Sequence, residues 1–149
     1  LELLHHDEHI DWALKSGVLA SSRILSHENF TMPADPRITI SCDPLWPSSQ
    51  EILEGSAAAR SAAAQVLERG FLARQIPEIP DPLILDIDLD YFLCDAALHP
   101  RDPSFFQELA ERARLITVSR ESDWVRLLRF RGETISADSL WDCLLTLLV

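Results

Sequence analysis

The chain has 149 residues, 47% of them hydrophobic, and carries a formal net charge of −11 at pH 7. This length is enough for one domain, spanning residues 1–149, whose core needs neither disulfides nor a structural metal. The negative charge argues against binding to a nucleic-acid backbone, and the absence of any long apolar run argues against a membrane-spanning segment.

The first predicted element is a short strand over residues 1–6, which leads into an acidic stretch. Asp7, His9 and Asp11 follow at alternate positions, so they share one side if the backbone stays extended. Residues 12–15 then begin a short helix. Because the chain begins inside its first predicted strand, we expect that the natural N-terminal strand of the domain is missing.

The middle of the chain predicts a modest strand, a long helix and a stiff connector. Residues 37–41 alternate polar and apolar side chains, with β-branched residues among them, which is typical of a strand. A capping box at Ser48–Glu51 precedes an alanine-rich segment, so we expect one helix over residues 48–69, ended by Gly70. The prolines of residues 76–82 favour an extended connector.

A buried strand that runs into three acids is the most distinctive segment. Residues 83–85 are apolar, which is typical of a strand buried on both faces of a parallel sheet, and Asp86, Asp88 and Asp90 follow at alternate positions. An extended backbone would place the three carboxylates on one side, where their repulsion would raise their pKa values. A divalent cation would remove that penalty. The alternative is a solvated acidic strand end.

The last third of the chain predicts helices around one more strand. The expected elements are a helix over 102–114, a strand over 115–118, and helices over 122–130 and 137–149, the last with a strand as the alternative for its leucine-rich end. In the helix over 122–130, Trp124, Leu127 and Leu128 are expected to face the core. Strands that alternate with helices predict an α/β fold with a mostly parallel sheet and helices on both of its faces.

The three cysteines indicate a reducing compartment. Cys42, Cys94 and Cys143 are odd in number, widely spaced and not part of a CxxC pair. They predict reduced thiols in a cytoplasmic protein, with no zinc–thiolate site.

Both acidic stretches follow a predicted strand, and chemistry in parallel sheets gathers at the carboxyl ends of the strands. If the stretches meet there, Asp7, Asp11, Asp86 and Asp88 supply four carboxylates and His9 supplies an imidazole. One cation does not need that much negative charge, whereas two cations about 3.5–4 Å apart do. Mixed Asp and His donors suit manganese better than calcium, so we expect two Mn²⁺ ions as cofactors.

The motif Asp-x-His-x-Asp in residues 6–11, together with Asp-x-Asp in residues 85–92, resembles the arginase–deacetylase (ureohydrolase-like) superfamily. The amino-acid sequences of these two segments are most similar to those of the peptide-arginase branch. Its members hydrolyse arginine side chains within a ribosomally made precursor peptide to ornithine and urea. The resemblance covers roughly residues 1–125 and implies a three-layer α/β sandwich, a binuclear manganese site and an arginine-containing peptide as substrate.

The resemblance also implies roles for individual ligands. Asp7 and Asp86 would bridge the two manganese ions. Asp11 would bind one ion, while His9 and Asp88 would bind the other. The family has a further histidine ligand on a strand before the first motif, and this chain begins too late to include that position.

Two further residues are candidates for catalysis. Glu121 follows the predicted strand at about the place where arginases hold the guanidinium with a glutamate, although an exposed acid that begins a helix is the common alternative. His27 is a candidate proton shuttle, since histidine titrates near neutral pH, although a single loop histidine is usually only solvated. Asp90 lies one residue earlier than the third aspartate of arginases, which leaves its role open.

Two other functions compete with this interpretation. In a phosphatase of the haloacid-dehalogenase type, Asp86 would be the nucleophile and Asp88 the general acid, with one Mg²⁺ ion. That family has Thr or Val where Asp90 stands, and the first acidic stretch would then have no role. The other alternative is an arginase-like module that binds a metal or a peptide without catalysis.

Overall fold

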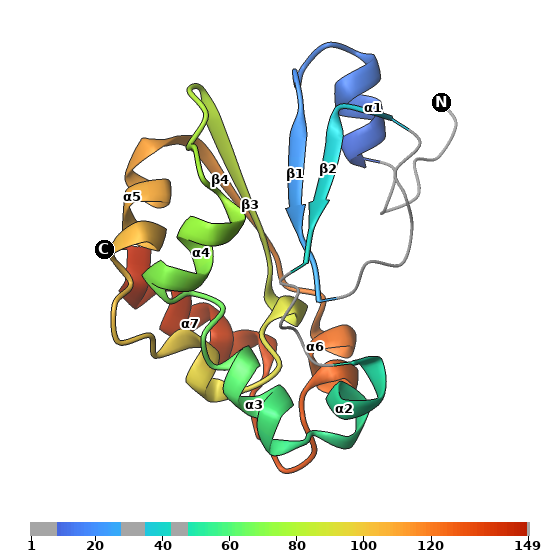
Figure 1. Cartoon of the computed structure of the whole chain (residues 1–149), viewed down its shortest axis with the longest axis vertical. Coiled ribbons are helices and arrows are strands. Elements are labelled where there is room, and N and C mark those ends of the chain that lie inside the picture. Colours follow the sequence, from blue (N-terminus) through green and yellow to red (C-terminus); the bar gives the residue numbers. More distant parts are fainter. Residues whose placement is uncertain (1–8, 28–34, 43–47, 149) are drawn as a thin grey trace. The chain divides into compact units, whose positions relative to one another are not determined.

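A computed structural model of the chain describes residues 9–27, 35–42 and 48–148 (Figure 1). The chain divides into two compact units, residues 1–44 and residues 45–149. Within the described residues, each unit contains a two-stranded parallel sheet accompanied by helices. The predicted α/β class with parallel strand pairing is therefore confirmed, while a single domain over the whole chain stays a prediction.

Unit 1 places two short strands beside one helix. Its described elements are α1 (His9–Lys15), β1 (Ser22–Leu25) and β2 (Ile38–Ser41). The two strands are parallel, with Ser22 opposite Ile38 and Leu25 opposite Ser41. The sequence predicts β2 but not β1, because Ile-Thr-Ile-Ser alternates apolar and polar residues whereas Ser-Arg-Ile-Leu does not.

Arg37 joins the start of β2 to α1. Its Nε and Nη2 donate hydrogen bonds to the two carboxylate oxygens of Asp35 at 2.9 and 2.6 Å, and its Nη1 donates to the carbonyl oxygen of Leu14 at 2.9 Å. The charge-assisted bonds from Arg37 lower the pKa of Asp35 to about 2. Arg37 therefore connects the start of β2 to α1 at Leu14, whose side chain is buried.

Unit 2 combines its two-stranded sheet with helices and 3₁₀ turns (Figure 1). Its strands are β3 (Leu83–Asp88) and β4 (Ala113–Ser119). Its helices are α2 (Ser49–Glu54), α3 (Ala57–Ala63), α4 (Arg69–Gln75), α5 (Ser104–Arg112), α6 (Ser122–Leu128) and α7 (Ala137–Leu148). Two 3₁₀ turns, η1 (Leu89–Tyr91) and η2 (Asp95–Leu98), follow β3. β3 and β4 are parallel, and α5 lies on the connection between them. This is the βαβ order that the sequence predicts.

In unit 2, helix α5 packs against both strands of the sheet. Ile84 and Leu115 lie opposite each other in the two strands and are 42% and 52% exposed, so one face of the sheet is open. The prediction of a strand buried on both faces, with helices on both sides of the sheet, is therefore wrong for this pair of strands.

The single helix expected over residues 48–69 is wrong. The predicted capping box is present at the start of α2, but Gly55 adopts a left-handed conformation with φ of 62° and ends that helix. Ser56 then caps α3, and α4 begins at Arg69, so Gly70 lies inside a helix and not after one. A glycine followed directly by a capping serine favours a break more strongly than the neighbouring alanines favour continuation.

The two glycines therefore predict opposite effects of the same substitution. Gly55→Ala should lower the free energy of unfolding by about 1–2 kcal/mol, because alanine is strained at positive φ. Gly70→Ala should raise it by about 0.5–1 kcal/mol, because a helical alanine restricts the unfolded chain, and the added methyl would meet its nearest neighbour at an ordinary 3.9 Å. Urea denaturation of the two variants measures both, and shifts of the same sign would contradict the helix break.

The core of unit 2 differs from the sequence prediction in α6. In the alanine-rich segment Ala59, Ala63, Val66 and Leu67 are buried, and Ile52 is half-buried. In α6, however, the exposed fractions are 47% for Trp124, 69% for Leu127 and 44% for Leu128, so the predicted inward face is wrong, and Val125 faces the core instead with 1% exposed. The packing of α6 against η1 determines which side of the helix is buried, so the smaller Val125 is buried while the larger side chains are exposed. No helix within the described residues is long and apolar enough to cross a membrane.

Candidate metal and guanidinium site

Asp86 and Asp88 lie on the exposed face at the carboxyl end of β3. They are two residues apart in one strand, so their side chains project to the same side. In the register of the sheet, Asp86 lies opposite Thr117 and Asp88 lies opposite Ser119. The hydroxyl of Thr117 donates a hydrogen bond to Oδ1 of Asp86. The neighbouring strand therefore orients the first of the two carboxylates.

Asp90 does not continue this alternation, contrary to the sequence prediction. β3 ends at Asp88, and the next three residues form the 3₁₀ turn η1. Leu89 and Phe92 are buried almost completely, and drawing both into the core requires the chain to turn. As a result Asp90 is half-buried, whereas Asp86 and Asp88 are exposed.

Asp90 lies within electrostatic range of Glu121. Burial raises the pKa of the Asp90 carboxyl, and the negative charge of Glu121 raises it further. Glu121 is exposed just after β4, where its backbone carbonyl accepts the first hydrogen bonds of α6, and its Oε1 lies 3.5 Å from the hydroxyl of Ser119. We call Asp86, Asp88, Asp90 and Glu121 the acidic edge of unit 2. The proximity of Asp90 to Glu121 can be recognised only once β3 and β4 are known to be neighbouring strands.

The raised pKa of Asp90 predicts a pH effect on stability. Because the folded state binds this proton more tightly than the unfolded state, Asp90 contributes stability below its ordinary pKa and loses that contribution as the pH rises through its folded pKa. The stability of Asp90→Asn relative to the parent protein should therefore increase as the pH rises from about 4 to about 7. Urea denaturation at both pH values measures this gain.

Asp102 supplies a control of opposite sign. A hydrogen bond from the Ser104 hydroxyl lowers the pKa of Asp102, so its contribution is present above its ordinary pKa and is lost as the pH falls. Asp102→Asn should consequently be less stable than the parent at neutral pH and equal to it in acid. Parallel pH trends for the two variants would show that Asp90 is not under the repulsion described.

The first acidic stretch lies in unit 1 and is not extended where the structure describes it. His9 and Asp11 are in helix α1, where residues two apart point about 200° away from each other, so the predicted sharing of one side is wrong for this pair. Asp11 lies 3.9 Å from the ammonium group of Lys15, one helical turn later. Asp7 lies outside the described residues.

His27 follows the carboxyl end of β1. It is half-buried, its Nδ1 atom is inaccessible to solvent, and its carbonyl oxygen accepts a hydrogen bond from the Cys42 thiol just beyond β2, with an S···O distance of 3.6 Å. The sequence places this histidine in a loop; the structure places it two residues after the end of β1, in contact with Cys42 just after the end of β2. Its role as a proton shuttle stays a prediction.

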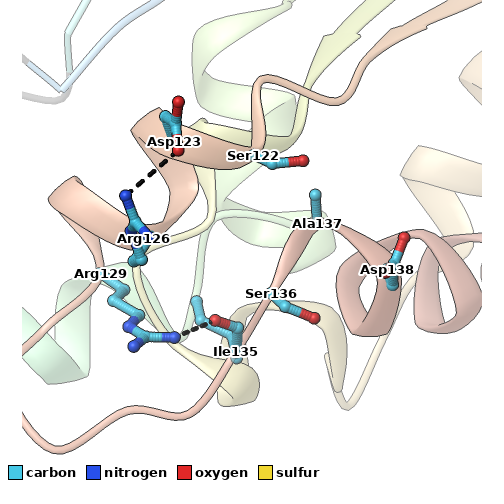
Figure 2. A pocket seen from close by; sticks show the side chains of 8 residues that line it. All are labelled: Ser122, Asp123, Arg126, Arg129, Ile135, Ser136, Ala137 and Asp138. Atoms are coloured by element: carbon cyan, nitrogen blue, oxygen red, sulfur yellow. Dashed lines mark hydrogen bonds and ion pairs between the residues drawn. The ribbon is translucent and has the colours of Figure 1, made fainter.

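A polar pocket of about 250 Å³ lies between α6 and the start of α7 (Figure 2). Arg126 lies 3.2 Å from the Asp123 carboxylate, and Nη1 of Arg129 donates to the carbonyl oxygen of Ile135 at 2.5 Å. Both guanidinium groups thus have acceptors within the protein. The predicted site residues are not among those that line this pocket, although its first lining residue, Ser122, directly follows Glu121.

The structure thus brings together Asp86, Asp88 and Glu121 in unit 2, and it places His9, Asp11 and His27 in unit 1. That the two groups form one site stays a prediction. The exposed carboxylates of Asp86 and Asp88 fit a hard or borderline divalent cation, since oxygen donors suit such ions. Comparisons of the chain with protein-family models, curated proteins and solved structures give no match. Its function is therefore inferred from its own side chains.

Proposed function

We propose that the chain is a manganese-dependent hydrolase of guanidinium groups, which converts arginine side chains in a ribosomal precursor peptide to ornithine and releases urea. The acidic edge carries this proposal, because it collects carboxylates from the ends of two adjacent parallel strands, where α/β proteins bind their ligands. The proposed fold of the whole domain is an arginase-like three-layer sandwich. The parallel pairs β1–β2 and β3–β4 are compatible with it.

In this proposal the metal ligands come from both acidic stretches. Asp86 and Asp88 would bind two Mn²⁺ ions together with Asp7, His9 and Asp11 of the first stretch. Because His9 and Asp11 point about 200° apart in α1, this set of ligands also requires α1 to unwind at its start. When bound, two such ions supply a shared water whose pKa is low enough for it to act as a nucleophile near neutral pH. Thr117 supports Asp86 by fixing the orientation of its carboxylate, as partners of metal ligands commonly do.

The remaining acids of the edge suit the substrate. A guanidinium group is planar and cationic, and a carboxylate can hold it through two parallel hydrogen bonds. Glu121 would do so, beside the half-buried Asp90. The net charge of −11 favours the approach of a cationic peptide.

The reaction adds the oxygen of water to the guanidinium carbon and breaks the bond from that carbon to the side-chain nitrogen. This nitrogen takes up a proton and remains on the peptide as the amine of ornithine. The carbon leaves as urea with the new oxygen and the other two nitrogens. His27 is the candidate that carries the proton to the amine.

A phosphatase of the haloacid-dehalogenase type is the second candidate. It is favoured by one observation: the two carboxylates it requires, Asp86 and Asp88, lie together at the end of β3 and need nothing from unit 1. Asp86 would then attack the phosphorus, Asp88 would protonate the leaving group, and one Mg²⁺ ion would be needed. The acid at position 90 and the first acidic stretch have no role in that reaction.

One pair of assays separates these functions. The full-length protein is incubated with Mn²⁺ and an arginine-containing peptide, and urea and the mass change from arginine to ornithine are measured; a parallel reaction contains Mg²⁺ and a generic phosphate ester. Urea release that a chelator abolishes supports the guanidinium hydrolase. Phosphate release without urea supports the phosphatase. Manganese binding with neither product indicates a non-catalytic module and contradicts both.

A further inference from the structure

We propose that Asp95, His99 and Cys143 form a second metal site, which binds a single zinc-like divalent cation and is independent of the acidic edge. One donor atom from each of the three side chains lies within 4.8 Å of the other two. Nε2 of His99 and Oδ2 of Asp95 are 3.4 Å apart. The carboxylate, imidazole and thiol donors are therefore close enough for one cation to reach all three after small side-chain movements.

The fold assembles this cluster from two elements that are far apart in the sequence. Asp95 begins η2 and His99 directly follows it, whereas Cys143 lies in α7, which packs against η2. The residues next to the donors belong to the core: Leu98 precedes His99, Leu144 follows Cys143, and both are buried. The packed core thus fixes the backbone at these positions, while Asp95 and His99 themselves face solvent.

A polar network also holds the start of η2. The backbone N–H of Asp95 donates a hydrogen bond to Oε2 of Glu133 at 3.2 Å. The other carboxylate oxygen of Glu133 accepts a hydrogen bond from Nη1 of Arg60 at 2.9 Å. Arg60 also donates to the carbonyl oxygens of Gly55 and Arg131, at 3.1 and 2.5 Å. The position of Asp95 is therefore fixed whether or not a metal is bound.

The set of donors selects the kind of metal. Thiolate, imidazole and carboxylate are the three side-chain ligands of Zn²⁺, whereas Mg²⁺ and Ca²⁺ prefer sites of oxygen alone. Zinc bonds of about 2.0–2.3 Å place tetrahedral donors about 3.3–3.8 Å apart. Donors that are at most 4.8 Å apart must then approach by roughly 1 Å, which exposed side chains achieve by small changes of rotamer. Three protein donors leave a fourth position for water.

Sequence spacing does not reveal such a site. The prediction that a zinc–thiolate site is absent follows from the lack of a CxxC pair, but a mixed site needs only one cysteine. Asp95 and His99 are four residues apart in one turn, and Cys143 reaches them only through the packing of α7. The alternative is a surface ion pair between His99 and Asp95 that happens to lie near a free thiol.

Cobalt is the probe that distinguishes these alternatives. Co²⁺ added to the full-length protein should produce a thiolate-to-cobalt charge-transfer band in the near ultraviolet, and Zn²⁺ should abolish this band by competition. Cys143→Ser should remove the band, and His99→Ala should weaken cobalt binding at least about tenfold. Cys42→Ser and Asp142→Asn are matched controls, since they change another half-buried thiol and the acid next to Cys143, and both should keep the band.

The stability of the protein supplies a second measurement. Zn²⁺ should raise the Tm of the parent protein, because a ligand that binds only the folded state stabilises it, and Cys143→Ser should lose that rise. Asp86→Ala should keep the cobalt band, which shows that the site is independent of the acidic edge. Absence of the band in the parent protein, its survival in Cys143→Ser, or its loss in Cys42→Ser would each overturn the proposal.

Discussion

Asp86→Ala is expected to abolish manganese binding and to reduce manganese-dependent hydrolysis by at least about 100-fold. Even the loss of a group that only supports a metal ligand typically costs 10–100-fold, and Asp86 is proposed to bridge both ions. Because Asp86 is exposed, the substitution should change stability by no more than about 0.5 kcal/mol, so that lost activity is not lost folding. Isothermal titration with Mn²⁺, urea release and thermal unfolding together measure these effects.

Two matched variants test whether the loss is specific. Glu111→Gln removes an exposed acid near the start of β4, at the end of the sheet opposite the acidic edge, and should retain both metal binding and activity. Thr117→Val removes the hydrogen bond that orients Asp86 and should weaken manganese binding by about 10–100-fold. Asp7→Ala should behave like Asp86→Ala if both residues bridge the ions. Retention of manganese binding in either alanine variant would contradict the bridging assignment.

Much of the fold could be predicted because its strongest patterns are local. The apolar run before Asp86 and the periodic segment at the C-terminus gave β3 and α7 close to their observed limits. The prediction of one helix over residues 48–69 was wrong because it followed the alanine-rich composition and gave too little weight to Gly55 and Ser56, which end one helix and begin the next. β1 was not predicted because Ser-Arg-Ile-Leu does not alternate polar and apolar residues, and only its pairing with β2 makes it a strand.

The candidate site was predictable to a lesser degree. The sequence shows that acids follow an apolar strand, and the structure places Asp86 and Asp88 on its exposed face. The sequence does not show where an extended segment stops. The burial of Leu89 turns the chain before Asp90, and the α1 helix contains His9 and Asp11, so alternation fails in both stretches. Local backbone conformation depends on burial, which the alternation of acids does not reveal.

Leu89→Ala should lower the free energy of unfolding by about 3 kcal/mol, within the range of 2–5 kcal/mol for buried leucines. Leu89 is 0% exposed and lies in η1, which packs against α6 and α7. Since a domain of this size is stable by about 5–15 kcal/mol, the loss is a large fraction of the total. Leu53→Ala, at a side chain that is 85% exposed, should change the value by less than about 0.5 kcal/mol. Urea denaturation measures both.

Leu89 also connects the core to the acidic edge, since it lies between Asp88 and Asp90 and its burial holds the turn between them. Leu72 provides the comparison, because it is 3% exposed but lies in α4, which packs against α5. Leu72→Ala should cost a similar amount of stability yet leave manganese affinity unchanged at a temperature where both variants are folded. Leu89→Ala should weaken that affinity as well. If the two variants bind manganese equally well, the conformation of η1 does not position the carboxylates, and the site depends on β3 alone.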